Sequence, residues 1–554
     1  MPTPPVEPAK PVDPIPTQPT EPTPTPTEPT QPTQPTQPTQ PTEPTPTAVS
    51  DVDPSCTSCG ATNSTTYSGS GVGIWHKKNT TLSPIDVRVD ISGLLNKEVT
   101  LLYTNETNTD VSMPAVTMPN SLLANSYLGP SPLATVSANY QPKVAGKAAV
   151  DEFNRIGWAK LLQQAKANQF QPRVSGNVSQ AEVADTRVFK HHDGTPHSTT
   201  LKKKVTTTDG TTVQFWVETS EAFEGKVSTS IVDQLATTFT SAGGIYDLLK
   251  NAGGPVWGSH SYDELLAAGQ PIDIVIMNIK PDAQPYGVMG YFYAMNNFKK
   301  AYAPDSNESV SLYLDSETLY LDGAAGMKAI KGTMAHEGLH MQNFFRRGVK
   351  IGPSYQYGVW LEEMTAMMME DAASSVVDTT YNSTRDMRYP QYLSYASYNC
   401  PLLEFTGFGA TCESYSVSGS FGGYLLRQMG MPFFTALLSK ADANSESALN
   451  ATIQQFRPTS SLSQELRKFA VAAATALPVT SAPSGYGFPA RNDGPYVIPA
   501  INGAAYKPYR VLPATAPSVL KGYGSFPVVR KNVTGSFKQT VKVPAGTTLS
   551  VIVN

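Results

Sequence analysis

The run His336-Glu337-Gly338-Leu339-His340 constrains this chain more than any other feature of its sequence. On an α-helix, positions i and i+4 are separated by about 40° around the axis, so His336 and His340 project from one face and can share a metal ion. Glu337 lies beside that face, where its carboxylate can take a proton from water instead of binding the metal. The spacing therefore predicts a metal-dependent hydrolytic site on a helix.

Apolar residues surround this run on nearly all sides of the predicted helix, which extends over about 326–347 and ends before Gly348. Such a helix lies in a protein core, where two histidines and a carboxylate are costly unless they have a partner. A chance occurrence of the pattern is disfavoured, because the whole chain contains only seven histidines. A bound zinc ion supplies the partner, and we expect zinc as the cofactor.

A zinc ion that activates water needs a third protein ligand. A second predicted helix, at about 359–375, opens with Trp360-Leu361-Glu362-Glu363 roughly twenty residues after His340, which leaves room for a loop and an antiparallel return. Glu362 and Glu363 cannot both face the zinc, since neighbours on a helix point about 100° apart. The residues alone leave open which of the two binds.

The HExxH motif followed by Trp-Leu-x-Glu resembles the glutamate zincins, and residues from about 185 to 430 are most similar to the hyicolysin family of secreted bacterial metallopeptidases. The resemblance implies a thermolysin-like fold, a zinc cofactor and cleavage of peptide bonds. It implies Glu363 as the third ligand, with Glu362 as the fallback.

Two further roles follow from resemblance to zinc peptidases. These enzymes often place an acid one turn after the ligand glutamate to orient a histidine; that position is Met367 here, which leaves Glu370 or Asp371 for the role. The segment that begins at Tyr415 is similar to the Tyr-x-x-Gly run of zinc aminopeptidases, although Ser418 stands where glycine is usual. The resemblance implies Tyr415 as a donor to the oxyanion, and an ordinary packing tyrosine is the alternative.

Two other segments have competing interpretations. His191, His192 and His197 surround Asp193 in a pattern that resembles a second metal cluster, but the Asp-Gly sequence between two predicted strands favours an exposed turn. The strand Ser309 to Leu314 is either the sheet edge that binds an extended substrate or a plain core strand, and the sequence does not choose between them.

The four cysteines form two local pairs, Cys56/Cys59 and Cys400/Cys412. An even count at short spacing favours two disulfides in an oxidising compartment. A redox dithiol or half a zinc ribbon is the alternative for the first pair, and two buried free thiols for the second.

Composition and periodicity divide the chain into four parts of an α+β protein: a disordered Pro/Thr-rich stalk at 1–50, an N-terminal β domain at 51–145, the metallopeptidase domain at 146–480 and a C-terminal β module at 481–554. Within the metallopeptidase domain, helices are expected near 149–168, 229–249, 326–347, 359–375, 419–430, 432–440, 445–456 and 462–475, and strands near 185–190, 201–207, 211–218, 272–277 and 309–314.

The net charge of −4 comes from 41 basic and 45 acidic residues without a basic stripe, which argues against nucleic acid as a partner. The sequence contains no apolar stretch of about 18 residues, the length that a membrane span needs. We expect a secreted or surface-attached monomer whose export leader has been removed and whose stalk is a spacer from the cell envelope.

These observations favour a zinc endopeptidase that acts on extracellular protein or peptide substrates, with Glu337 as general base. A stalked surface adhesin on a zincin scaffold is the alternative from another class, but a binding module has no use for the intact Glu337. An aminopeptidase is a third hypothesis, and no exopeptidase signature supports it.

Overall fold

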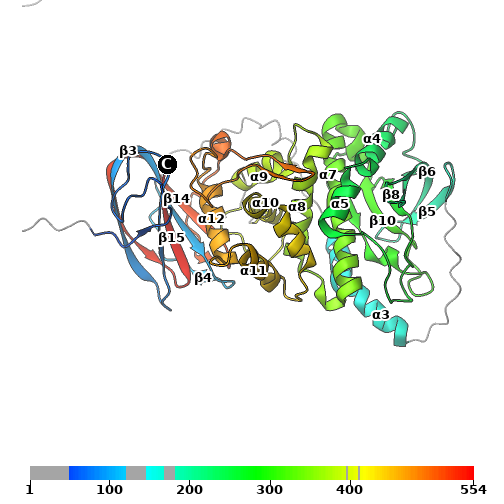
Figure 1. The fold of residues 1–554 in the computed structure, drawn as a ribbon, viewed down its shortest axis with the longest axis horizontal. Coiled ribbons are helices and arrows are strands. Elements are labelled where there is room, and N and C mark those ends of the chain that lie inside the picture. The colour runs from blue at the N-terminus through cyan, green and yellow to red at the C-terminus, as the bar shows by residue number, and fades with distance from the viewer. Residues whose placement is uncertain (1–48, 120–144, 168–180, 395–396, 408, 410–411) are drawn as a thin grey trace, which may run out of the picture. The chain divides into compact units, whose positions relative to one another are not determined.

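Residues 48–554 form one unit of the chain. In this unit, helices lie between two separate β-sheets (Figure 1). The computed structural model describes residues 49–119, 145–167, 181–394, 397–407, 409 and 412–554. The predicted α+β class is confirmed. Residues 1–48 of the predicted stalk lie outside the described residues.

The larger sheet is mixed and carries the helices of the candidate site. Its strand order is β5-β6-β7-β8-β10-β9, with β7, β8 and β10 parallel and the remaining pairs antiparallel. Every residue of β8 is buried, because helices or strands cover both of its faces, which explains its continuous apolar run. The strands are β5 (Thr186–Lys190), β6 (Pro196–Thr206), β7 (Thr212–Glu218), β8 (Ile272–Met277), β9 (Gly290–Phe292) and β10 (Val310–Asp315).

Most predicted helices of this region are confirmed with small shifts in their ends. The segment 229–249 is two helices that are separated at Gly243, whose φ of +75° suits glycine. The predicted helices 419–430 and 432–440 are the two parts of α10, which meet at a kink where Gly430 has a non-helical φ of +80°. The helices are α2 (Ala145–Glu152), α3 (Trp158–Ala167), α4 (Thr229–Thr240), α5 (Ile245–Gly253), α6 (Ser316–Leu321), α7 (Gly323–Asn343), α8 (Val359–Val377), α9 (Tyr389–Ser394), α10 (Ser414–Ser439), α11 (Ser445–Phe456) and α12 (Leu462–Ala474), with shorter helical turns η1 (Phe153–Gly157), η2 (Ala294–Asn297), η3 (Phe344–Ile351), η4 (Pro353–Tyr355), η5 (Thr384–Arg388) and η6 (Gly503–Tyr509).

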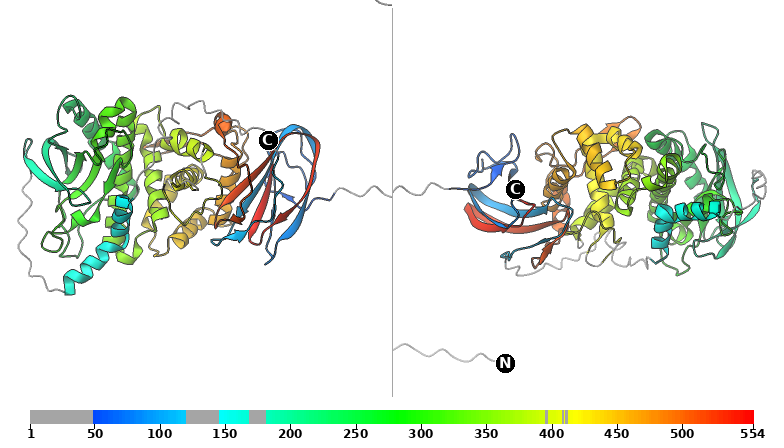
Figure 2. Two further views of the ribbon diagram at one scale, coloured as in Figure 1. Left: turned by 180° about the vertical axis from the view of Figure 1, so that it is seen from behind. Right: turned by 90° about the horizontal axis from the view of Figure 1, so that it is seen from below.

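The second sheet corrects the separation of the N-terminal β domain from the C-terminal β module. Its order is β1-β2-β15-β3-β14, so strands from both ends of the unit alternate, and Figure 2 shows blue and red strands side by side. The two β segments therefore do not form independent modules. The strands are β1 (Asp53–Pro54), β2 (Gly73–Lys78), β3 (Ile85–Asn105), β14 (Ser525–Val543) and β15 (Thr547–Val553); β4 (Val111–Ser112) pairs with β13 (Val519–Leu520), and β11 (Arg491–Asp493) with β12 (Tyr496–Ile498).

The alternation of side chains along β3 and β15 joins this sheet to the helices. Leu101 and Val551 point into a core on one face, whereas Leu102 and Ile552 point into the core that the helices share. Helix α12 packs against β3 and β14 on that second face. Both faces of the sheet are thus covered along β15 and the second half of β3, where every residue from Glu98 to Asn105 is buried.

Helix α7, which carries the HExxH run, is buried as predicted. It packs between strands β9 and β10 on one side and helices α5 and α8 on the others. Gly290 of β9 brings the sheet close to this helix, because a β-carbon there would lie 2.6 Å from the side chain of Thr333 and 3.4 Å from that of Glu337. The closeness of β9 to Glu337 places the sheet edge at the candidate site.

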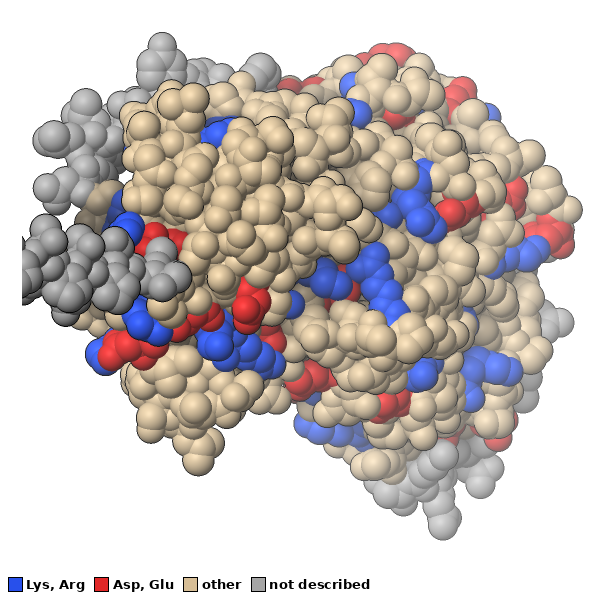
Figure 3. Space-filling view, turned by 60° about the vertical axis from the view of Figure 1, so that its left-hand side comes forward, with Lys and Arg blue, Asp and Glu red and all other residues tan. Residues whose placement is uncertain are grey.

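Ion pairs between acidic and basic side chains are spread over the surface. On the face that Figure 3 shows, acidic and basic side chains gather in small mixed groups rather than in a field of one sign. Arg88 with Asp51 and Lys542 with Asp86 are examples from the second sheet.

Both predicted cysteine pairs are bonded in the structure, with Cα atoms 5.8 Å apart for Cys56 and Cys59 and 5.2 Å apart for Cys400 and Cys412. In the described part of the chain, the helices are too short or too polar to cross a membrane.

Removal of Arg427 is expected to destabilise the fold. Its guanidinium forms a fully buried ion pair with Asp371 from α8, with Nη2 3.1 Å from Oδ1. Arg427→Met leaves this carboxylate buried without its cation, which costs about 3–5 kcal/mol of unfolding free energy. Urea unfolding followed by circular dichroism measures the change. The control Arg88→Met breaks an exposed pair and should have little effect; equal midpoints for the two variants would contradict the assignment.

Candidate active site

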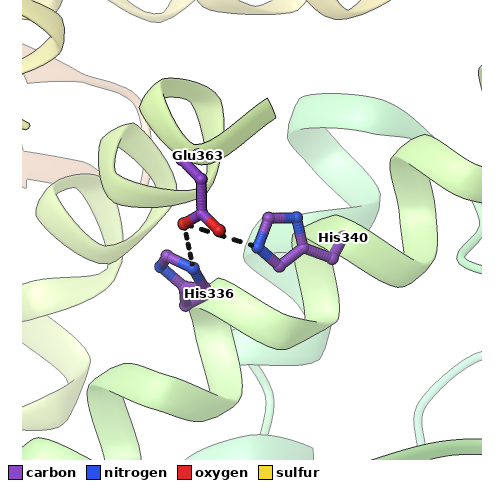
Figure 4. Close-up of side chains that lie close together, drawn as sticks. All are labelled: His336, His340 and Glu363. Atoms are coloured by element: carbon purple, nitrogen blue, oxygen red, sulfur yellow. Dashed lines mark hydrogen bonds and ion pairs between the residues drawn. The ribbon is translucent and has the colours of Figure 1, made fainter. Parts of the chain in front are cut away.

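Two carboxylates orient the histidines of the HExxH run. Glu370 Oε1 lies 2.6 Å from His336 Nδ1, and Glu362 Oε1 lies 2.8 Å from His340 Nδ1. Because each Nδ1 atom is held by a carboxylate, the Nε2 atom of each ring remains for another partner. The Nε2 atoms of both rings point toward Glu363 (Figure 4).

Glu363 completes a group that could hold a metal ion. Its Oε2 atom lies 3.1 Å from His336 Nε2 and 3.9 Å from His340 Nε2. One ligand atom from each of the three residues lies within 4.8 Å of the others, and all three residues are buried. Glu362 turns instead to the far side of His340. The structure thus places Glu363, which the resemblance implied, and not its fallback, between the two histidines.

The chemistry of this group fits a divalent cation. His340 Nε2 is buried and has no hydrogen-bond partner among the described residues, although it points at a carboxylate. Burial lowers the pKa of His336, but the contacts with Glu363 and Glu370 outweigh it and raise the pKa to about 10. The surrounding carboxylates therefore favour positive charge at this point, either from a proton or from a metal ion.

Glu337 and Tyr415 line one cleft with His336. The cleft encloses about 650 Å³. Glu337 is 4% exposed and lies against β9, whereas Tyr415 comes from the first turn of α10. The ring of Tyr415 lies 4.9 Å from that of Phe405 and 5.3 Å from the guanidinium of Arg388. The predicted base and the predicted oxyanion donor thus face the same space.

Sequence reasoning missed the cation beside the candidate ligand. Lys147 Nζ of α2 lies 2.7 Å from Glu363 Oε1 and 3.0 Å from Asp151 Oδ1. Burial lowers the pKa of Lys147, but Asp151 and Glu363 outweigh it and hold the pKa well above its ordinary value. Burial in turn raises the pKa of Glu363, and Lys147 and His336 hold it well below its ordinary value. A single lysine in a helical stretch gives no sequence signal for such a contact.

Arg388 and Glu370 form a second missed contact. The guanidinium of Arg388 lies 3.4 Å from Glu370 Oε1, the oxygen that also contacts His336 Nδ1. Of the two acids expected to orient a histidine, Glu370 contacts His336, while Asp371 pairs with Arg427. No motif recognised in the sequence includes Arg388.

The remaining sequence candidates lie elsewhere. His191 donates to or accepts from the hydroxyl of Tyr291 over 2.8 Å, and His197 lies 3.1 Å from Glu218. His191 is buried, so the exposed turn predicted there is limited to the residues around Asp193. Strand β10, one candidate for the substrate edge, is flanked by β8 and β9, so it is a core strand. The short strand β9 is the edge.

Comparison with known proteins agrees with this geometry. Residues 193–554 match the family model of peptidase M30. The chain belongs to the peptidase M30 family. The family match includes α7, α8 and α10, which carry the five predicted site residues, and it confirms the predicted family. Residues 54–118, which include β2 and β3, match a domain of unknown function (DUF8571).

A curated relative in this family is the neutral metalloprotease ShpI of Staphylococcus hyicus. It is 27% identical to the chain over 252 residues, which are 44% of this chain and 53% of that protein. The match therefore spans about half the length of the relative. Its name and the M30 family together imply a metal cofactor, for which the group of His336, His340 and Glu363 offers ligands.

Loss of either orienting carboxylate should weaken metal binding. Glu370→Gln and Glu362→Gln each remove the charged acceptor of one Nδ1 atom, and changes of this kind typically cost 10- to 100-fold in metal affinity. Competition titration of zinc against a chromophoric chelator measures the affinity. Glu182→Gln, an exposed carboxylate paired with Lys204, is the matched control and should not differ from wild type. Unchanged affinity in both site variants would exclude the orienting role.

Proposed function

We propose that this chain is a zinc-dependent endopeptidase in which His336, His340 and Glu363 bind the metal and Glu337 is the general base. The observation that carries the proposal is the buried His-His-Glu group, whose three ligand atoms converge while carboxylates hold the opposite nitrogens of both rings. Two nitrogens and one carboxylate oxygen are a ligand set of catalytic zinc sites. Membership of the M30 family supports the reaction class.

The residues of the cleft have distinct roles in the proposed reaction. When bound, zinc supplies a Lewis acid that polarises the peptide carbonyl and lowers the pKa of water to about 7. The Glu337 carboxylate accepts the proton of the attacking water and delivers it to the leaving amine. The hydroxyl of Tyr415 donates a hydrogen bond to the carbonyl oxygen as negative charge develops there. Glu362 and Glu370 hold the imidazole rings in place.

The finer fold assignment is also a proposal. A mixed sheet with the antiparallel edge strand β9, followed by two antiparallel metal-site helices, supports a thermolysin-like unit within 146–480. The two disulfides support a location outside the reducing cytosol, in the secreted or surface-attached state expected for the stalked chain. The adhesin alternative is not favoured, because the family is one of peptidases.

Removal of the base should abolish proteolysis without removing the metal. Wild type is expected to digest unfolded casein, to stop with 1,10-phenanthroline and to recover with added zinc. Glu337→Gln should lose about 10²- to 10⁴-fold in kcat while zinc content stays equal. Glu182→Gln is again the control. Equal activity of Glu337→Gln and wild type would refute the mechanism, whereas cleavage restricted to peptides with a free N-terminus would identify an aminopeptidase.

Tyr415→Phe should lower kcat and leave zinc affinity unchanged. Loss of one oxyanion donor costs about 10²- to 10³-fold in other enzymes. Steady-state kinetics on a fluorogenic peptide with a blocked N-terminus separates kcat from KM. Tyr509→Phe changes a half-exposed tyrosine outside the cleft and serves as control. A kcat equal to that of wild type would show that Tyr415 only packs.

A further inference from the structure

The helical segment 145–157, made of α2 and η1, covers the candidate active site. Five of its residues line the same cleft as His336, Glu337 and Tyr415: Lys147, Ala148, Asp151, Glu152 and Arg155. Behind them only about 40 Å³ remains between the segment and a wall that includes Glu337, His340 and Glu363. The segment thus fills space that the site residues face.

The side chain of Asn154 forms hydrogen bonds with the backbone at the edge of the sheet. Its Nδ2 donates to the carbonyl oxygen of Phe292, and its Oδ1 accepts from the backbone N–H of Ala294, each over 2.8 Å. Phe292 is the last residue of β9, which pairs with β10 on its inner side, and Ala294 begins η2 two residues later, so Asn154 binds the backbone where the edge strand ends. A carboxamide that donates to residue i and accepts from residue i+2 reproduces the two hydrogen bonds that one residue of an added parallel strand would make to an edge strand through its own N–H and C=O. Asn154 therefore holds the position that an extended peptide would take.

The ammonium of Lys147 forms an ion pair with Glu363, the candidate metal ligand. It lies 2.7 Å from Oε1 of Glu363, whose Oε2 faces the two histidines. A divalent cation bound by these three residues would share one carboxylate with this ammonium in a buried site, where like charges repel strongly. Lys147 therefore weakens the binding of a divalent cation to these three residues for as long as α2 stays in place.

The anchoring of the segment is uneven. Trp158, the first residue of α3, is fully buried and packs edge-on against Phe344 at 5.0 Å between ring centroids. Leu162 of α3 joins the same core. By contrast, Val150 is the one buried residue of α2 among those whose side chains are described, and the contacts of Lys147 and Asn154 are polar. Apolar burial therefore fixes α3 more firmly than α2 and η1, in which only the half-buried Phe153 makes a ring contact, with Tyr293 at 5.2 Å, among the described residues, and whose polar contacts water can replace.

We propose that residues 145–157 form an internal autoinhibitory cover that substrate must displace. Asn154 holds the edge of β9 in place of a substrate peptide, Lys147 neutralises Glu363, and α3 remains as the anchor about which the cover moves. This inference rests on the proposed function, because it assigns the covered edge and carboxylate to substrate and metal.

Weakening the cover should raise activity through KM. Lys147→Met and Asn154→Leu are each expected to lower KM for a blocked fluorogenic peptide about three- to tenfold at equal kcat, because a competing closed form raises the apparent KM to its intrinsic value divided by the open fraction. Both variants should also bind zinc more tightly, because Lys147 leaves Glu363 when the cover opens, and Lys147→Met should show the larger effect. Lys160→Met, an exposed lysine on the anchored α3, is the matched control. A higher KM, a lower kcat or weaker zinc binding in Lys147→Met would overturn the proposal and make Lys147 a positioning residue of the working site.

A second measurement does not depend on hydrolysis. In zinc-loaded Glu337→Gln, saturation with the tripeptide hydroxamate Ala-Phe-Leu-NHOH should accelerate hydrogen exchange of the α2 amides and leave α3 protected. Unchanged protection of α2 at saturation, or no binding of the hydroxamate by any variant, would overturn the cover. Exposure of α2 together with a wild type that cleaves no peptide would support the cover and refute the endopeptidase.

Discussion

The pairing of α7 with α8 is the interaction on which the rest of the candidate site depends. Helix α7 carries two histidines and Glu337 into a core, where polar groups without partners are costly. Helix α8 meets them with Glu362, Glu363 and Glu370, whose carboxylates reach three different nitrogen atoms of the two rings. These contacts fix how the two helices face each other. The edge strand and the first turn of α10 then close the cleft around a group that is already rigid.

The same carboxylates make the site a place where cations compete. Burial lowers the pKa of His340, but the hydrogen bond that its ring donates to Glu362 and the charge of Glu363 outweigh it, so this pKa is raised, as is that of His336. Protons on the histidines, a bound metal and the ammonium of Lys147 can each balance the surplus negative charge. Metal binding therefore releases protons and works against Lys147. Occupancy of the site is decided by this balance and not by ligand geometry alone.

Local signals explain what the sequence could predict. The i, i+4 spacing placed His336 and His340 on one face, and the continuous apolar run of β8 and the helical pattern of α11 predicted the limits of both elements to the residue. Long-range pairing explains the rest. Strand β15 enters the second sheet between β2 and β3, more than 440 residues away in sequence at residue pairs such as Thr547 and Asn105, and no local pattern encodes such a register. Strand β9 is too short to be read as a strand, and Lys147 reaches Glu363 across 216 residues.

The proposed cover shows why so few contacts suffice to block such a site. Asn154 imitates one residue of an extended chain and Lys147 one positive charge, which is a small part of what a substrate and a metal ion provide. A tethered segment, however, acts at an effective concentration in the millimolar range, so weak contacts hold it in place against dilute short peptides. An unfolded protein chain offers further backbone pairs along β9 and can displace it. The features that would recognise the substrate, an open strand edge and a charged carboxylate, are thus also the ones that allow the chain to cover itself.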